Sequence, residues 1–426
     1  MIEIDKKIVE RAILVAIRTP NVSRDRIDEY LDELEMLADT AGAETLFKVV
    51  QDRQKIDTAF YIGKGKVEEI AELVEMNDVN LIIFDDDLSP NQVRNLEKMI
   101  DKKIVDRSGL ILDIFAAHAR TKEAKTQVEL AQLQYMLPRL TRMWTHLSKQ
   151  YGGIGTKGPG ETQIETDRRL IRTRISKLKE KLGKIESRQE VKSAKRETFL
   201  TTSLVGYTNA GKSTLLNLLT DAGVLAENKL FATLDSTTRS FEVAKKKKII
   251  ISDTVGFIRK LPHNLIASFK STLNVVNEAD VILHVIDVTN PFFEDHMKVV
   301  DDTLKELGCS KKMQIKVFNK VDALEDKSRI DYIKAKYNDC ILISAERGIN
   351  ISALKERLLE IYEENYGEQH LKLSITDSKT IAKIHSLADV TSVNYEDEFV
   401  EISYRVNQVN SSKIKKLVEE IESRKQ

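Results

Sequence analysis

The octapeptide 206–213, GYTNAGKS, has the G-x-x-x-x-G-K-S spacing that is typical of a phosphate-binding loop. It follows the apolar run 200–205 and precedes TLLNLLT, which predicts the strand–loop–helix context that such a loop requires. Glycines let backbone amides close on phosphate oxygens, and the helix N-terminus adds positive potential. We expect Lys212 to reach the β- and γ-phosphates and the Ser213 hydroxyl to bind Mg²⁺. The residues expected around the phosphates are Gly206, Tyr207, Thr208, Asn209, Ala210, Gly211, Lys212 and Ser213.

A second motif, Asp253-Thr254-Val255-Gly256, comes directly after the apolar run KKIIIS. An acid at a strand end beside a phosphate loop can hold the Mg²⁺ shell, and the Gly256 amide can meet a γ-phosphate. By itself D-x-x-G is a weak signal. Downstream of a phosphate loop it indicates a nucleotide triphosphate site.

Two further motifs predict a base pocket. In Asn319-Lys320-Val321-Asp322, which follows the strand-like QIKVF, the carboxylate can accept both the N1–H and the 2-amino group of guanine. Adenine lacks that pair of donors, so an unpaired buried acid would penalise ATP. Ser344-Ala345-Glu346 follows ILI, where a backbone amide can meet guanine O6.

The segment Phe231-Ala232-Thr233-Leu234-Asp235 stands where a switch loop belongs. A threonine there can bind Mg²⁺ only while the γ-phosphate is present, which produces an order–disorder switch. Thr237 and Thr238 are alternative candidates. Our preference for Thr233 rests mainly on the family resemblance given below.

Composition limits the class of protein that must position these residues. With 426 residues, 41% hydrophobic and 31% charged, the chain supports two to four folded domains and is not disordered throughout. Cys309 and Cys340 are not spaced as a metal pair and are interpreted as buried thiols. The apolar run 12–17 is too short for a signal peptide or a membrane span. We therefore expect a cytoplasmic, reduced protein.

Residues 1–117 alternate strand-like and helix-like patterns, which predicts a small parallel α/β subdomain. The expected strands are 12–17, 45–51 and 81–87, and the expected helices are 24–42, 66–76 and 89–100. Gly42 is a plausible helix stop, and Ser89-Pro90 is a typical helix start.

Residues 118–197 lose the strand pattern. Leucines at 130, 133, 137 and 140 indicate a helix that Pro138 should kink, and the Gly-rich 151–161 is expected to be a loop. After it, Ile164, Ile171, Leu178 and Ile185 recur every seven residues, which predicts a second arm and so a helical hairpin of coiled-coil type. That arm carries Arg168, Arg169, Arg172, Arg174, Lys177, Lys179 and Lys181.

Residues 198–366 return to an α/β pattern, with buried parallel-type strands expected at LTTSLVGY, KIIISDT, VILHVIDV, MQIKVFN and ILISA. Residues 367–426 are expected to form a separate α+β appendix, with strands LKLSI and EFVEISYRV and the helix SSKIKKLVEEIES. The predicted fold class is α/β: a mostly parallel sheet flanked by helices, an N-terminal α/β subdomain with a helical hairpin, and a small C-terminal domain.

The formal net charge of +0 hides a segregation of charge along the chain. Residues 1–117 hold 16 basic and 25 acidic side chains, whereas 118–197 hold 19 basic and 9 acidic. A solvated coiled coil is the ordinary interpretation of such a charge run. Here Trp144, His146 and Tyr151 lie beside it, and aromatics with guanidinium groups can stack on unpaired RNA bases. We favour an RNA contact.

The ordered motifs are those of a translation-factor-type GTPase, and the chain closely resembles the HflX family of bacterial ribosome-associated GTPases. The resemblance rests on GYTNAGKSTLLN, LFATLD, DTVGF, NKVD, GPGETQIETDRR and YIGKGK (61–66) and covers roughly the first 365 residues. It implies a P-loop GTPase domain, GTP and GDP as ligands, and binding to the large ribosomal subunit. It also implies that GTP drives dissociation or remodelling of stalled ribosomes. The alternative is an assembly or hibernation-type binding module in which GTP only gates attachment. We expect a monomer.

Two residues shape the expected mechanism. Phe257 stands where many small GTPases carry a water-orienting Gln, so hydrolysis should be slow without help from the ribosome. Asn209 resembles the potassium-coordinating Asn of related GTPases, and K⁺ there could stabilise transition-state charge. A role of Asn209 in its own loop is an equal alternative. The expected catalytic residues are Lys212, Thr233, Gly256 and Asn209, and the expected Mg²⁺ ligands are Ser213 and Thr233. In YIGKGK we expect a basic turn before a helix rather than a second nucleotide site.

Overall fold

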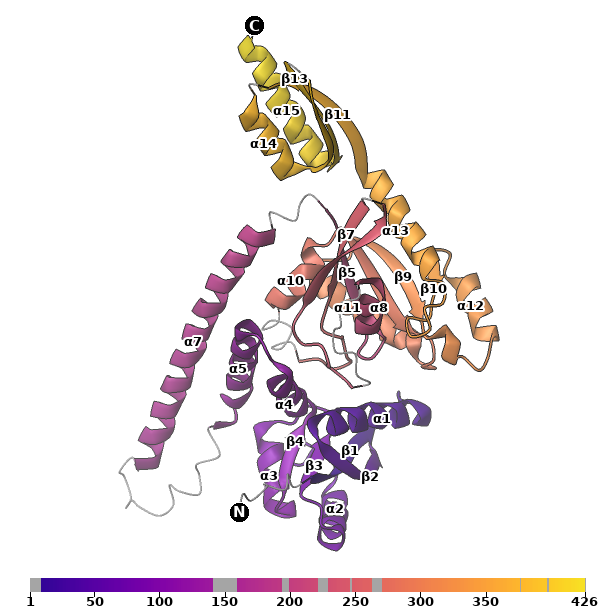
Figure 1. Ribbon diagram of the computed structural model, residues 1–426. Helices are drawn as coiled ribbons and strands as arrows, with labels where there is room; N and C mark the ends of the chain where they lie inside the picture. The colour runs from indigo at the N-terminus through magenta and orange to yellow at the C-terminus, as the bar shows by residue number, and fades with distance from the viewer. Residues whose placement is uncertain are drawn as a thin grey trace, which may run out of the picture. The chain divides into compact units, whose positions relative to one another are not determined.

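The computed structural model describes residues 9–140, 159–193, 199–220, 229–245, 247–262, 270–375, 377–396 and 398–425 (Figure 1). The chain divides into two compact units. The first comprises 1–183 with 227–235 and 260–270, and the second comprises 184–226, 236–259 and 271–426. We describe each unit by itself.

The first unit is built on a parallel sheet with strand order β2-β1-β3-β4. Strands and helices alternate as β1 Glu10–Arg18, α1 Arg24–Ala41, β2 Ala43–Asp52, α2 Lys64–Asn77, β3 Leu81–Phe84, α3 Pro90–Ile100, β4 Lys103–Asp106 and α4 Arg107–His118. Six consecutive buried residues in β1 fit a strand that is covered on both faces, and Ile13 and Val15 pack with α2 and α3 in one core. The α/β alternation is confirmed. The sequence patterns do not predict β4 and α4.

Local sequence signals define where the helices around this sheet begin and end. Gly42 ends α1 in a left-handed conformation with φ 88°, as expected of a helix stop. Ser89 and Gln92 form a reciprocal capping box at the start of α3, with Pro90 in its first turn. Both predicted boundaries are confirmed.

Two helices follow in sequence, α5 Lys122–Met136 and α7 Pro159–Ser193. The first unit includes α5 and the part of α7 up to Gly183, and the remainder of α7 belongs to the second unit. Two predictions are corrected here. Pro138 does not kink a continuing helix, because α5 already ends at Met136, in keeping with the poor fit of a proline to a helix interior. The Gly-rich loop does not extend to Glu161, because α7 begins at Pro159, and proline is favoured in a first helical turn. Residues 141–158, which include most of the predicted Gly-rich loop and Trp144, His146 and Tyr151, lie outside the described residues.

The second unit holds a six-stranded sheet with order β10-β9-β8-β5-β7-β6, parallel except for the antiparallel edge strand β6. Its strands are β5 Leu200–Gly206, β6 Thr237–Ala244, β7 Lys247–Asp253, β8 Val281–Asp287, β9 Met313–Asn319 and β10 Cys340–Leu342. Its helices are α8 Lys212–Thr220, α10 Lys270–Glu278, α11 Phe293–Glu306, α12 Ser328–Lys336 and α13 Ile351–Asn365, with Lys270 the last residue of the first unit. All five predicted strands are present, whereas β6 is not predicted.

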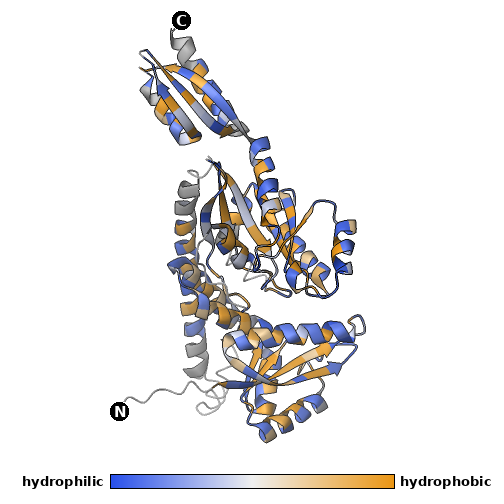
Figure 2. Ribbon diagram, turned by 45° about the vertical axis from the view of Figure 1, so that its right-hand side comes forward, coloured by the Kyte–Doolittle hydropathy of each residue, from blue (hydrophilic) through white to orange (hydrophobic). Residues whose placement is uncertain are grey.

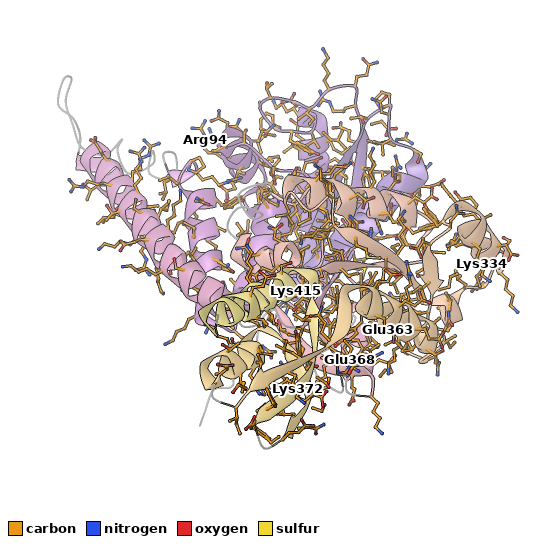
Figure 3. The ribbon with its side chains drawn as sticks, turned by 90° about the horizontal axis from the view of Figure 1, so that it is seen from above. Arg94, Lys334, Glu363, Glu368, Lys372 and Lys415 are labelled. Atoms are coloured by element: carbon orange, nitrogen blue, oxygen red, sulfur yellow. The ribbon has the colours of Figure 1, made fainter. Side chains whose placement is uncertain are left out.

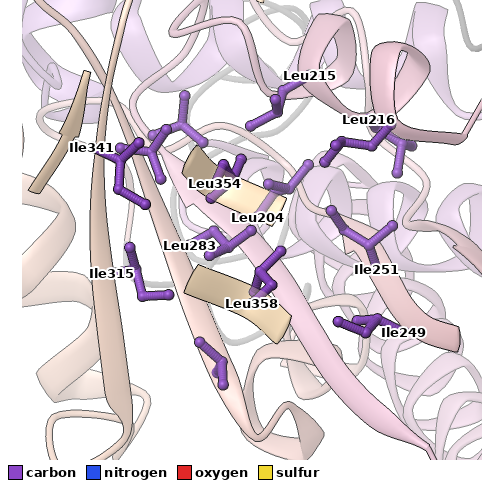
Figure 4. Packing of buried hydrophobic residues seen from close by; sticks show 14 of the residues in the cluster. Leu204, Leu215, Leu216, Ile249, Ile251, Leu283, Ile315, Ile341, Leu354 and Leu358 are labelled. Atoms are coloured by element: carbon purple, nitrogen blue, oxygen red, sulfur yellow. The ribbon is translucent and has the colours of Figure 1, made fainter. Parts of the chain in front are cut away.

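The core of this sheet is aliphatic. Leu204 and Leu283, on the neighbouring strands β5 and β8, pack with Leu215 of α8 and with Leu354 and Leu358 of α13 (Figure 4). The hydropathy colouring shows the same pattern, with hydrophobic strands inside and helices that turn hydrophilic faces outward (Figure 2). This packing fixes the strand ends from which the functional loops leave.

The C-terminal part is an antiparallel sheet with order β11-β13-β12 that packs with two helices. Its elements are β11 Tyr366–Ser374, α14 Ser378–Leu387, β12 Asp389–Tyr395, β13 Phe399–Asn407 and α15 Gln408–Lys425. Glu363 on α13 pairs with Lys247 of β7, and Glu368 and Lys372 lie on β11 (Figure 3). The two predicted strands and the predicted C-terminal helix are confirmed, with α14 and β12 as additional elements, and all of them belong to the second unit.

Candidate nucleotide-binding site

The loop between β5 and α8 has the backbone of a phosphate cradle. Asn209 and Gly211 adopt left-handed conformations, with φ of 60° and 90°, which turn successive amides toward one side. Gly206 ends β5 so close to β8 that a Cβ would lie 2.2 Å from the Val285 carbonyl oxygen. Only glycine fits there, which explains the first glycine of the motif.

Lys212 is anchored inside this loop. Its Nζ donates to the carbonyl oxygens of Tyr207, at 2.8 Å, and Gly206, at 3.2 Å, and the side chain is 6% exposed. Burial lowers the pKa of Lys212 to about 8, although nearby Asp253 acts in the opposite direction. The ammonium is thus held where phosphate oxygens can replace the carbonyls as partners.

The D-x-x-G segment lies directly against the phosphate loop. The Ser213 hydroxyl donates to Asp253 Oδ2 at 2.6 Å, and Asp253 is fully buried at the end of β7. A Cβ on Gly256 would lie 2.8 Å from the Thr208 Cα and 3.1 Å from the Lys212 Nζ. The close approach of two backbones therefore requires glycine at 256.

Asn319 joins the phosphate loop to the predicted base pocket. Its Nδ2 donates to the Ala210 carbonyl at 2.9 Å, while its Oδ1 accepts from the Ala345 N–H at 2.9 Å. Ser344 and Ala345 are buried, and Glu346 is exposed. Since the Ala345 amide already has a partner in Asn319, a guanine O6 would have to share or replace that bond.

Two other residues of this motif, Lys320 and Asp322, make charged contacts. Lys320 has a left-handed backbone, with φ 66°, and its Nζ pairs with Asp287 Oδ2 at 2.6 Å. Asp322 lies in a short 3₁₀ helix, Val321–Ala323, with its side chain 20% exposed and Arg347 3.9 Å away. Sequence reasoning missed Asp287, although an acid at the end of the apolar strand VILHVID was a usable signal.

The predicted switch segment folds with the first unit. Phe231 packs edge-to-face on Phe115 of α4, with ring centroids 4.7 Å apart. The Asp235 carboxylate accepts from the backbone N–H of Arg120 and from the N–H and hydroxyl of Thr121, which caps α5. Thr233, with Ala232 and the buried Leu234, lies in this anchored loop.

The alternative threonines differ from Thr233 because they belong to strand β6 of the second unit. Thr238 bonds through its hydroxyl to Ser252 at 2.8 Å, and Thr237 is paired in register with Asp253. Sheet pairing of this kind is poorly suited to an order–disorder switch.

Lys260, which the sequence reasoning missed, anchors a second segment to the first unit. Its Nζ lies 2.9 Å from Asp85 Oδ2 and also pairs with Asp86, both just after β3. Asp85 in turn pairs with the buried Arg107 at 2.9 Å. The patterns gave no signal for a pair so distant in sequence.

The sheet, the phosphate loop, the D-x-x-G segment and the N-K-x-D motif together define a P-loop GTPase. Family models agree: one described as "GTP-binding GTPase N-terminal" matches residues 28–116, "GTP-binding GTPase Middle Region" matches 118–196, and "50S ribosome-binding GTPase" matches 201–320. The chain belongs to the HflX family of GTPases, and it binds and hydrolyses GTP.

Curated relatives named GTPase HflX match most of the chain. The relative from Magnetococcus marinus is 45% identical, covering 92% of this chain and 91% of its own. That from Escherichia coli is 41% identical over 91% of each, and that from Flavobacterium psychrophilum is 52% identical over 74% of this chain and 76% of its own. Among solved structures, the SsGBP and GDP complex matches at 25% identity with a TM-score of 0.49, covering 83% of this chain and 98% of that one.

Two oxygen donors lie beside the phosphate loop. Within the described ranges, no three His, Cys, Asp or Glu side chains gather in a way that could hold a metal ion. The Ser213 hydroxyl and the Asp253 carboxylate are nevertheless paired at 2.6 Å, and oxygen donors of this kind fit Mg²⁺.

No helix in the described part of the chain is long and apolar enough to cross a membrane.

Proposed function

We propose that this chain binds the large ribosomal subunit and uses its GTP state to dissociate or remodel stalled ribosomes. The "50S ribosome-binding GTPase" description of the model matching residues 201–320 supports a ribosomal partner. Nucleotide-dependent work also needs a connection from the switch segments to the rest of the molecule. The anchoring of Asp235 at Thr121 and of Lys260 at Asp85 supports such a connection.

The observation that carries the RNA part of the proposal is the basic surface of α7. Arg169, Arg172, Lys177, Lys179 and Lys181 are exposed, whereas Leu178 and Leu182 are buried. Arg174 pairs with Glu129 of α5 at 2.6 Å, which joins the two helices. Exposed Lys and Arg along a helix can neutralise phosphates of ribosomal RNA.

For catalysis we propose that Lys212 and the Gly256 amide stabilise the charge on the γ-phosphate. Ser213, with Thr233 in the GTP state, would hold Mg²⁺, which neutralises phosphate charge when bound. Around the base, Asp322 would accept hydrogen bonds from guanine. The aliphatic part of the Lys320 side chain, whose ammonium pairs with Asp287, would form one side of the pocket.

Hydrolysis by the free protein should be slow. Phe257 is 2% exposed and offers no group to orient water. We propose that the large subunit supplies what is missing, so GTP turnover should rise at least about tenfold when subunits are added. Lys212→Ala, mixed with the same subunits, measures the background. Equal turnover with and without subunits would contradict the proposal.

Asn209 carries the proposal of a K⁺ site. Its left-handed backbone is one that asparagine tolerates well, so the loop itself also explains the residue. If K⁺ binds, turnover with ribosomes should be several-fold higher in KCl than in NaCl, and Asn209→Ala should remove the difference. Equal turnover in the two salts would count decisively against a K⁺ site.

The proposal also covers the domain division, the oligomeric state and the location of the chain in the cell. We propose four functional parts, 1–117, 118–197, 198–366 and 367–426, in a monomer that works in the cytoplasm, where ribosomes are. The alternative, a binding module in which GTP only gates attachment, shares the motifs and differs in whether ribosomal subunits are released.

A further inference from the structure

Tyr207, the second residue of the phosphate loop, has its side chain held by residues outside that loop. Its ring stacks on the imidazole of His296, with ring centroids 3.8 Å apart and planes at 2°. Its hydroxyl accepts a hydrogen bond from the Arg259 N–H at 3.0 Å. Phosphate loops bind phosphate through backbone amides, so these side-chain contacts serve another purpose.

The contact with Arg259 extends an existing junction between the phosphate loop and the segment after Gly256. The Thr208 N–H donates to the Phe257 carbonyl at 2.7 Å, and the Phe257 N–H donates to the Gly206 carbonyl at 3.0 Å. The Tyr207 hydroxyl adds a third hydrogen bond two residues further on. The segment is thereby fastened to the loop on both sides of Ile258.

His296 fixes the plane of the Tyr207 ring. It lies on α11 next to Met297, which is buried in a neighbouring core, so the imidazole is carried by a packed helix. A stacked ring cannot swing about its χ angles without losing the contact. The position of the Tyr207 hydroxyl, and of the amide that it accepts from, therefore depends on His296.

We infer that Tyr207 and His296 are positioning residues for GTP hydrolysis. By holding the Arg259 amide they fix the short segment that begins at Gly256, whose amide is the one proposed to stabilise the γ-phosphate. Phe257 orients no water, so exact backbone placement is the main means this segment has to act. GDP has no γ-phosphate and should not depend on the pair. The inference concerns hydrolysis by the chain alone and does not rest on a ribosomal partner.

The test compares Tyr207→Phe, His296→Ala and His296→Phe with the wild-type full-length chain, without ribosomes. Loss of one hydrogen bond or one stack should lower kcat for GTP about threefold to tenfold and leave the Kd for GDP within about twofold. Hydrogen exchange at the Arg259 amide should accelerate by a similar factor in Tyr207→Phe and His296→Ala. His296→Phe keeps a flat ring and should restore most of kcat. Lys298→Ala, an exposed position on the same helix, is the control.

Two results would overturn the inference. In one, Tyr207→Phe and His296→Ala leave both kcat and the exchange of the Arg259 amide within twofold of wild type. In the other, GDP binding weakens by the same factor as kcat falls, which would mean that the pair only shapes the phosphate loop. Near-wild-type GDP binding also shows that each variant is folded, so a loss of kcat cannot be attributed to unfolding.

Discussion

At the residue scale, the proposed base pocket depends on one carboxylate with one-fifth of its side chain exposed, Asp322, beside the positively charged Arg347. Asn319 ties the pocket to the phosphate loop through two hydrogen bonds of 2.9 Å, and Asp287 holds Lys320. In this arrangement Asp322 is the group that should read the hydrogen-bond donors of guanine. The other residues hold the pocket in shape.

Asp322→Asn should therefore change base preference without unfolding the chain. An amide can pair with the 2-oxygen of xanthine but loses one acceptor for guanine, so GDP should bind at least about tenfold more weakly and XDP more tightly. Competition of GDP and XDP against a fluorescent nucleotide measures both. Asp331→Asn, on an exposed helix position, is the control. Unchanged GDP affinity in Asp322→Asn would remove this assignment of the guanine site.

Lys212 gives a pH dependence with a definite sign. Burial lowers its pKa from 10.5 to about 8, so between these values the unfolded chain binds more protons than the folded one. Stability without nucleotide should rise with pH across that window. Phosphate oxygens favour the charged lysine, so GDP binding should take up a proton above pH 8. The affinity for GDP should therefore fall as the pH rises further. Titration calorimetry at pH 8.5 in buffers of different ionisation heat measures the uptake.

Lys212→Arg is the matched control for this titration. Its guanidinium stays charged at pH 8.5, so any uptake left in that variant comes from the nucleotide or from other groups. Equal uptake by wild type and Lys212→Arg would show that Lys212 does not titrate in this range.

At the element scale, α7 separates a buried seam from a basic surface, and α5 pairs with it through Arg174 and Glu129. The sequence predicted this arm because a seven-residue repeat is a local pattern. It did not predict where α5 ends or that α7 starts at Pro159, since helix ends depend on capping and packing. For the same reason β4, β6 and the Tyr207–His296 stack escaped prediction, whereas the phosphate loop, defined by adjacent residues, did not.

Deleting 151–160, the predicted Gly-rich tip of the hairpin, should spare GTP affinity and impair ribosome splitting. Replacing Arg172 and Lys179 by Glu should weaken binding to large subunits and flatten its salt dependence, because fewer counterions are released. Co-sedimentation from 50 to 200 mM salt measures the slope. Lys415→Glu with Lys416→Glu, on the exposed side of α15, is the matched control. Intact splitting after the deletion would show that the tip is not the working end.

At the scale of the whole molecule, a net charge of +0 combines an acidic N-terminal part with a basic 118–197. The predicted switch segment 231–235 and Lys260 both belong to the first unit, although strands β6 and β7 of the GTPase sheet lie between them in sequence. The chain therefore passes from one unit to the other at each end of this pair of strands. This connection is what a GTPase that performs mechanical work would need.

The central claim is tested most directly by sedimentation of intact ribosomes in a gradient. Ribosomes are incubated with this chain and GTP, a non-hydrolysable GTP analogue or GDP, with Lys212→Ala as the control. We predict free subunits with GTP and with the analogue, the chain sedimenting with the large subunit, and intact ribosomes with GDP or the control. Ribosomes that stay intact under all conditions while the chain co-sediments with them would contradict the account and favour the binding module.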